Sequence, residues 1–189
     1  HRFFRKNEKA LKVGDVKVLE GITHHCRQHG VHFLVIGGHA INAHGYARQT
    51  SDLDLLVAKS DRDFWLKLME ALRYSAVQTH EVFARFKPPD LAAWPIDFMF
   101  VDMEVFKQML QEAVPADFGS INAEVPSLRH MLALKLHALK QRQKHREQRD
   151  ILDVIKLKEL SGISEAEFLE LCRNYDRLDL YEKISTGRC

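Results

Sequence analysis

Two aspartates separated by one leucine, at positions 52 and 54, constrain this chain more than any other feature of its sequence. They open the run DLDLLVA, whose apolar residues predict a strand over 53–58. Side chains two positions apart on a strand project from the same face, so we expect the carboxylates of Asp52 and Asp54 side by side. Ionised carboxylates are costly to bury unless they are paired or bind a metal. A divalent cation is the simplest common partner, and oxygen-only ligands favour Mg²⁺ or Mn²⁺.

A pair of glycines, Gly37 and Gly38, directly follows another apolar run, VHFLVI over 31–36, which also predicts a strand. Glycine lets the backbone approach a phosphate closely, and a helix predicted for 39–46 would offer unpaired N–H groups to an anion. Taken alone, two adjacent glycines usually form a turn, and an acidic pair is more often a solvated strand end. The order strand, glycine turn, helix, loop and acidic strand favours one site that binds phosphate and metal together.

The composition is that of a globular chain, with 46% hydrophobic and 29% charged residues among 189. No apolar run is long enough to span a bilayer, and the first residues lack the apolar core of a signal peptide. We therefore expect a cytoplasmic protein without a membrane partner. Because position 1 is histidine rather than methionine, we also expect that a few residues are missing before it.

Cysteine and histidine spacing argues against disulfide and zinc sites. The three cysteines are far apart and none lies in a CxxC pair, so buried or incidental thiols are expected. His25 and His29 have helical i,i+4 spacing, but no glutamate lies between them and no third ligand is evident.

The periodicity of the remaining chain predicts an α+β fold, a small mixed sheet flanked by helices with a helical C-terminal part. Further helices are predicted for 15–29, 61–74 and 103–113, and further strands for 80–86 and 96–101. Residues 114–127 are rich in turn formers and predict a linker, which places a domain boundary near residue 120. We expect a catalytic domain over 1–120 and a helical subdomain over 121–189 that completes a nucleotide cleft.

Positive charge is concentrated in residues 129–149, which carry seven Lys or Arg and one acid. Lys135, Arg142 and Arg149 are seven residues apart, a spacing that predicts a basic stripe along one helix face. Such a stripe is usually a solvated face, and residues 140–150 contain no apolar side chain, so this stretch either breaks the helix or lines an open cleft. If it met a triphosphate, Lys135 would act as a point charge and Arg142 as a planar fork for phosphate oxygens. Asp150 and Asp153 are interpreted first as partners of these cations.

The glycine and aspartate motifs resemble the nucleotidyltransferase superfamily that includes DNA polymerase beta. The matching residues are Ile36, Gly37 and Gly38, followed by Asp52, Leu53 and Asp54. Residues 35–57 and 135–157 are similar to two motifs of the AbiEii-type nucleotidyltransferases, the toxin branch of abortive-infection toxin–antitoxin systems. In that family the residues matching Lys135 and Asp150 also belong to the active site. His39 departs from the superfamily, in which a small hydroxyl residue is common after the glycines.

The resemblance implies a third carboxylate on a neighbouring strand. Asp97 is the candidate, because it is the one acid with strand-like apolar residues on both sides. Asp102 and Glu81 are the alternatives.

The implied activity is metal-dependent transfer of a nucleoside monophosphate from an NTP to an acceptor hydroxyl. Asp52, Asp54 and Asp97 would bind the metal, and Asp97 would accept the hydroxyl proton. Gly37, Gly38, Ser51, Lys135, Arg142 and Asp150 would bind the nucleotide, and Arg48 would either contact phosphate or brace its loop. The toxin branch favours RNA, such as a tRNA 3′ end, as the acceptor and an antitoxin protein as a partner. The alternatives are a catalytically silent binding module and an antibiotic-type enzyme that modifies small molecules.

Overall fold

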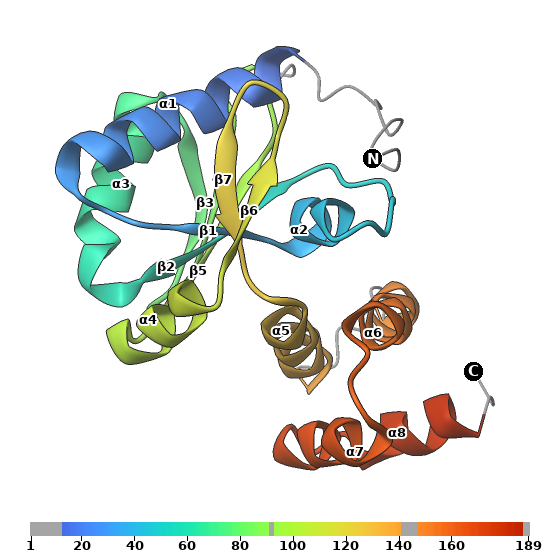
Figure 1. Cartoon of the computed structure of the whole chain (residues 1–189). Coiled ribbons are helices and arrows are strands. Elements are labelled where there is room, and N and C mark those ends of the chain that lie inside the picture. The colour runs from blue at the N-terminus through green and yellow to red at the C-terminus, as the bar shows by residue number, and fades with distance from the viewer. Residues whose placement is uncertain (1–12, 91–92, 141–146, 187–189) are drawn as a thin grey trace. The chain divides into compact units, whose positions relative to one another are not determined.

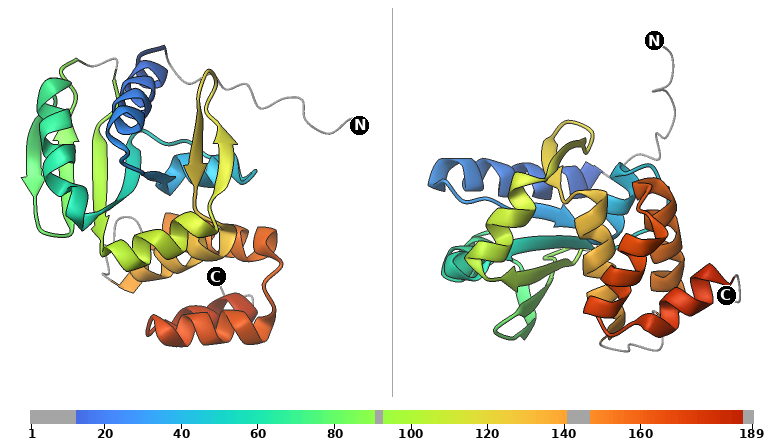
Figure 2. Two further views of the ribbon diagram at one scale, coloured as in Figure 1. Left: turned by 60° about the vertical axis from the view of Figure 1, so that its left-hand side comes forward. Right: turned by 60° about the horizontal axis from the view of Figure 1, so that its bottom comes forward.

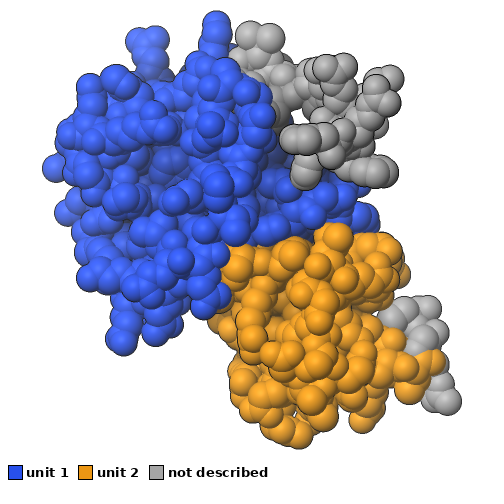
Figure 3. All heavy atoms as spheres, viewed as in Figure 1, with its two compact units in different colours: residues 1–126 blue, residues 127–189 orange. Residues whose placement is uncertain are grey.

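The computed structural model describes residues 13–90, 93–140 and 147–186, and it divides the chain into two compact units at Pro126 and Ser127 (Figure 3). Each unit is described by itself. The helices and strands of both are labelled in Figure 1.

The first unit is built on a five-stranded mixed sheet of strand order β1-β2-β5-β4-β3. The strands are β1 (Leu34–Ile36), β2 (Leu53–Ala58), β5 (Ile96–Val101), β4 (Phe83–Lys87) and β3 (Ser75–Thr79). Only the β2–β5 pair of this sheet is parallel, with Asp54 aligned to Asp97, while the other neighbours are antiparallel. A parallel pair needs a long crossover, which η1 (Lys59–Asp61), α3 (Arg62–Ala71), β3 and β4 provide.

The core of this unit lies between the sheet and its helices. The Trp65 ring of α3 packs on Phe98 of β5, with ring centroids 5.1 Å apart, and both side chains are fully buried. Helix α1 (Val13–His29) lies beside α3 and buries Leu19, Ile22 and Cys26, the apolar positions that its periodicity predicts. Helix α2 (Gly37–Ala43) follows β1, and α4 (Met103–Gln111) follows β5.

The helix predicted for 39–46 is α2, which begins at Gly37 and ends at Ala43, and the strand predicted for 80–86 is β4, which covers 83–87. Two further local predictions in this unit are wrong. Helix α3 ends at Ala71 rather than residue 74, since Arg73 has a φ of 62°, and the chain continues into β3, which is exposed at every position and so shows no apolar alternation. The predicted linker contains a β-hairpin of β6 (Val114–Asp117) and β7 (Asn122–Val125). The turn of the hairpin needs Gly119, at φ 90°, and the side chains of Phe118 and Ile121 beside it are buried.

The second unit is helical, as predicted. It consists of α5 (Leu128–Lys140), α6 (Glu147–Ser161), α7 (Glu165–Asn174) and α8 (Leu178–Ser185), with α5 packed along α6 (Figure 2). Helix α7 begins with a capping box in which Ser164 and Glu167 satisfy each other's backbone N–H groups. The prediction of an α+β fold with a mixed sheet and a helical C-terminal part is confirmed. Among the described residues, no helix is both long and apolar enough to cross a membrane.

Candidate active site

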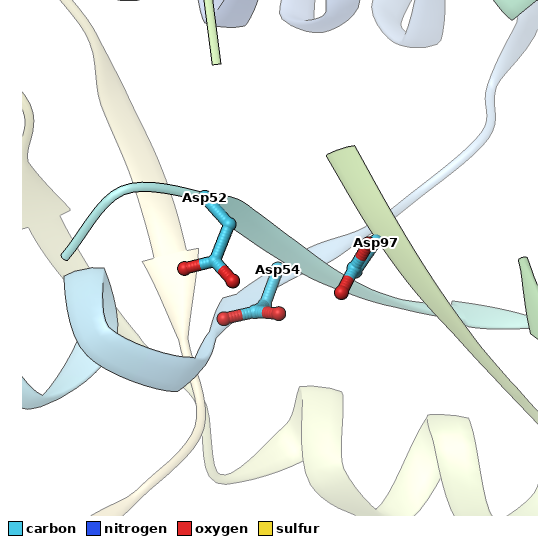
Figure 4. Close-up of side chains that lie close together, drawn as sticks. All are labelled: Asp52, Asp54 and Asp97. Atoms are coloured by element: carbon cyan, nitrogen blue, oxygen red, sulfur yellow. The ribbon is translucent and has the colours of Figure 1, made fainter. Parts of the chain in front are cut away.

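Three carboxylates converge at one end of the β2–β5 pair (Figure 4). Asp52 directly precedes β2, Asp54 lies within it, and Asp97 lies on β5 in register with Asp54. One oxygen from each of the three carboxylates lies within 4.8 Å of the others, and Asp97 is only 5% exposed. Three converging carboxylates match the all-oxygen ligand set of Mg²⁺ or Mn²⁺, so the residues present fit a divalent cation.

Arg85 on β4 compensates part of this negative charge. It is aligned with Asp97 across the sheet, and its Nε donates to Asp97 Oδ1 at 2.8 Å while its Nη2 donates to Oδ2. The paired carboxylate raises the pKa of Arg85, with smaller contributions from Asp52 and Asp54 in the same direction. Thr50 holds the other side of the cluster, since its hydroxyl donates to Asp52 Oδ1 at 3.2 Å.

The glycine pair is required because other side chains occupy the space beside it. Gly37 has a φ of 62°, and a Cβ at this position would overlap the Asp54 carboxylate. A Cβ on Gly38 would lie 2.6 Å from the Thr50 side chain. The chain therefore brings the backbone at the end of β1 directly against the acidic strand, which residues with side chains would prevent.

The loop between α2 and β2 is held by its own polar groups. Asn42 accepts from the Arg48 backbone N–H at 2.8 Å and donates to the Arg48 carbonyl at 2.9 Å. The Arg48 guanidinium donates to the Gln49 carbonyl at 3.1 Å within the same loop. Ser51 is exposed and directly precedes Asp52.

His39 is buried on α2 against the ring of Trp94, with ring centroids 4.1 Å apart. Burial lowers the pKa of His39 to about 4, which Asp52 opposes and Arg48 reinforces. Its Nε2 atom is buried and has no hydrogen-bond partner within the part of the chain that the structure describes. A neutral imidazole thus occupies the position where the resemblance leads us to expect a small hydroxyl residue.

The alternative acids lie apart from the cluster. Glu81 and Asp102 both pair with Lys59, each at 3.3 Å, and their side chains are 84% and 75% exposed. Asp97 alone among the three candidates lies beside Asp52 and Asp54.

The second unit contains a compact ion-pair cluster. Lys135 of α5 lies 2.8 Å from a carboxylate oxygen of Asp150 and 2.8 Å from one of Asp153, both on α6. The prediction that Asp150 and Asp153 are partners of the basic residues is confirmed for Lys135. The side chains are 13%, 14% and 1% exposed, so the expectation of a solvent-facing cation is wrong at Lys135.

The basic stripe does not run along one helix. Fifteen residues of continuous helix span about 22 Å, whereas Lys135 and Asp150 are in direct contact because α5 and α6 are separate, packed helices. Lys135 therefore lies on α5, and Arg149 is exposed on α6. Arg142 lies outside the described residues.

The sequence alone did not reveal Arg85 or Thr50 as neighbours of the cluster, or Trp94 as the neighbour of His39. The alternation in FARFK over 83–87 places Arg85 and Phe83 on one strand face, but the pairing of that strand with β5 is long-range information. Thr50 lies two residues before Asp52, so its proximity to the cluster was easier to predict from the sequence than that of Arg85.

A sequence model of the family described as "Nucleotidyl transferase AbiEii toxin, Type IV TA system" matches residues 24–180, which is more than half of the chain. The chain belongs to this AbiEii nucleotidyltransferase family. The predicted resemblance is thus confirmed, as is the prediction of a nucleotidyltransferase enzyme. No curated protein sequence matches the chain significantly.

Solved structures with similar folds are themselves nucleotidyltransferases. ANT(2")-Ia in complex with adenylyl-2"-tobramycin has a TM-score of 0.60 at 16% identity, covering 92% of this chain and 98% of that chain. The Megavirus polyadenylate synthase has a TM-score of 0.59 at 15% identity, covering 83% of this chain and 33% of that chain. An antigenic nucleotidyltransferase-like protein from Paracoccidioides brasiliensis has a TM-score of 0.53 at 18% identity, covering 79% and 78%. At these identities the likeness to these three solved structures shows a shared fold alone.

Proposed function

We propose that this AbiEii family member transfers a nucleoside monophosphate from an NTP to a hydroxyl group of RNA, as the toxin of a toxin–antitoxin pair. The observation that carries the proposal is the convergence of Asp52, Asp54 and Asp97 from two strands whose parallel register aligns Asp54 with Asp97. The family supports the transfer chemistry and an antitoxin partner. The choice of RNA, such as a tRNA 3′ end, rests on the resemblance to the toxin branch.

In the proposed mechanism, Asp52 and Asp54 would hold Mg²⁺ or Mn²⁺, and Asp97 would contribute a further ligand oxygen. The cation, when bound, would neutralise charge on the phosphate oxygens during transfer. Asp97 accepts the proton of the acceptor hydroxyl at a carboxylate oxygen. The hydroxyl oxygen then forms the new bond to the α-phosphorus while the bond to the leaving pyrophosphate breaks.

The nucleotide contacts are proposed for the backbone at Gly37 and Gly38 and for the side chain of Ser51. Support comes from the exposed position of Ser51 and from the missing side chains at the glycines, which bring the backbone against Asp54. Arg48 is proposed to position this loop. Lys135, Arg142 and Asp150 are proposed as further nucleotide-binding residues on the basis of the family resemblance alone.

The proposal is tested by incubating the chain with each α-labelled NTP, Mg²⁺ and either total RNA or total protein. Label should enter RNA with wild type and not with Asp54→Asn. Asp102→Asn is the matched control, since it removes an exposed carboxylate that pairs with Lys59 rather than joining the cluster. Label entering protein, or no release of pyrophosphate with any acceptor, would contradict the proposal.

A small-molecule acceptor is the second candidate, and one comparison favours it. The ANT(2")-Ia structure, similar in fold over most of both chains, contains an adenylylated aminoglycoside antibiotic. An aminoglycoside is a polycation, so this alternative predicts adenylylation of tobramycin without labelling of RNA. Adding tobramycin as a third acceptor in the same experiment distinguishes the two.

A further inference from the structure

Arg85 and Asp97 form a two-hydrogen-bond ion pair at the acidic cluster. The planar guanidinium engages both carboxylate oxygens of Asp97, which is only 5% exposed, while the Arg85 side chain is 35% exposed. Two parallel hydrogen bonds to one carboxylate are stronger and more directional than a single ion pair. The Arg85 guanidinium also lies 5.8 Å from the ring centroid of Phe83 on the same strand.

A divalent cation and Arg85 would share the same carboxylate. A carboxylate has about four lone-pair positions, and Arg85 occupies two of them, one on each oxygen of Asp97. The cation would also meet a cluster whose formal charge Arg85 reduces from three negative charges to two. Both effects, competition for oxygen and repulsion between cations, oppose metal binding at Asp97.

We propose that Arg85 is an internal counter-ion that restrains metal binding and positions Asp97 for proton transfer. In the metal-free chain it relieves the repulsion among the three carboxylates. A bound metal would use one of the remaining lone-pair positions of Asp97, which weakens the Arg85 hydrogen bond to that oxygen while Arg85 retains the carboxylate through the other. Arg85 is thus a positioning residue that acts through Asp97, and this inference rests on the proposed metal site at Asp52, Asp54 and Asp97.

The two roles predict opposite effects of one substitution. Arg85→Gln should bind Mn²⁺ about tenfold more tightly than wild type, because the repelling cation and its competing hydrogen bonds to Asp97 are removed. The same variant should transfer nucleotide more slowly, because the Asp97 carboxylate is no longer oriented. A merely structural role would weaken metal binding and transfer together.

The test is a Mn²⁺ titration of the full chain. Electron paramagnetic resonance at each step measures the concentration of free Mn²⁺ directly. Wild type is compared with Arg85→Gln, Arg85→Lys and Asp54→Asn, and with Lys59→Gln as a control that removes another paired cation, in η1 directly after β2. Arg85→Lys should give an intermediate affinity, since it retains the charge but not the fork. Lys59→Gln should match wild type.

The possible failures are distinguishable. If Asp54→Asn binds Mn²⁺ as well as wild type does, the metal site itself is wrong. If Mn²⁺ binding depends on Asp54 but Arg85→Gln binds no more tightly than wild type, the metal site stands and the role of Arg85 is overturned. If Arg85→Gln does not fold, Arg85→Lys decides, and an affinity equal to or weaker than that of wild type overturns the proposal.

Discussion

Lys135 and Asp153 face each other at 2.8 Å between helices α5 and α6, and the Asp153 side chain is 1% exposed. Asp150 accepts from the same ammonium group at 2.8 Å. The pair is almost completely removed from water, so the charge of each partner is stabilised by the other and not by solvent. Lys135 consequently stabilises the helical unit whatever its part in nucleotide binding.

Replacing Lys135 with alanine should lower the free energy of unfolding by about 3–5 kcal/mol, because it leaves two largely buried carboxylates without their cation. Lys140→Ala is the matched control on the same helix, since Lys140 and its partner Asp176 are 50% and 74% exposed. That control should cost less than about 1 kcal/mol. Urea denaturation of both variants measures the difference, and equal midpoints would contradict the buried ion-pair cluster.

Asp52→Asn and Asp54→Asn should each abolish nucleotide transfer while leaving the fold nearly unchanged, since the substitution removes charge without changing shape. The double variant should be little worse than either single one, because residues that act as one unit are not additive. Steady-state pyrophosphate release and circular dichroism provide the two measurements. Near-wild-type turnover in both single variants would exclude the cluster as the catalytic site.

Asp97→Asn should reduce turnover more than NTP binding, because its proposed work is on the attacking hydroxyl and on the metal. Asp102→Asn and Glu81→Gln should leave both unchanged, since these carboxylates pair with Lys59 and are largely exposed. NTP titration and turnover are measured on the same preparations. Loss of turnover in Asp102→Asn or Glu81→Gln, with Asp97→Asn active, would show that the third carboxylate is wrongly assigned.

Comparing Gly37→Ala with Gly30→Ala distinguishes the effect of backbone strain from the effect of displacing Asp54. Gly37 and Gly30 have nearly equal φ angles, 62° and 64°, but only at Gly37 would a Cβ overlap another side chain, that of Asp54. Gly37→Ala and its control Gly30→Ala should each lose about 1 kcal/mol of stability, because alanine is strained in the left-handed backbone conformation. Gly37→Ala should additionally lose transfer activity and Mn²⁺ affinity, because Asp54 has to move. Retention of full activity in Gly37→Ala would contradict the close approach.

His39 should make stability depend on pH. Its pKa is about 4 in the fold, against an ordinary value of 6.5, so between these values the unfolded chain binds a proton that the folded chain does not. Stability is therefore lost as the pH falls below 6.5. Between pH 7.5 and pH 5, wild type should lose about 2 kcal/mol more than His39→Gln does. Urea denaturation at each pH measures the free energy of unfolding of both proteins. If the free energies of the two proteins changed with pH by equal amounts, the imidazole of His39 would not be held neutral in the fold.

The sequence by itself determined those features that lie within one element or one short segment. The spacing of Asp52 and Asp54 places both carboxylates on one side of a strand, and the glycine pair marks the end of the preceding strand. The apolar periodicity after Pro126 predicts the helical unit, which the structure confirms. Strand β3 escaped prediction because its exposed residues carry no apolar period. The β6–β7 hairpin escaped prediction because the turn formers around it indicated a linker, although Ile121, Ala123 and Val125 alternate with polar residues and are buried.

Only the tertiary structure decided which residues meet. The choice of Asp97 over Asp102 and Glu81 depends on the parallel register of β2 with β5, strands separated by about forty residues of chain. The paired hydrogen bonds from Arg85 to Asp97 depend in turn on the register of β4 with β5. Lys135 is largely shielded from solvent because α5 and α6 pack side by side, so it belongs to an ion-pair cluster and not to an exposed basic stripe. Local periodicity determines which face a side chain occupies within its element, whereas long-range strand register and helix packing determine its neighbours across elements.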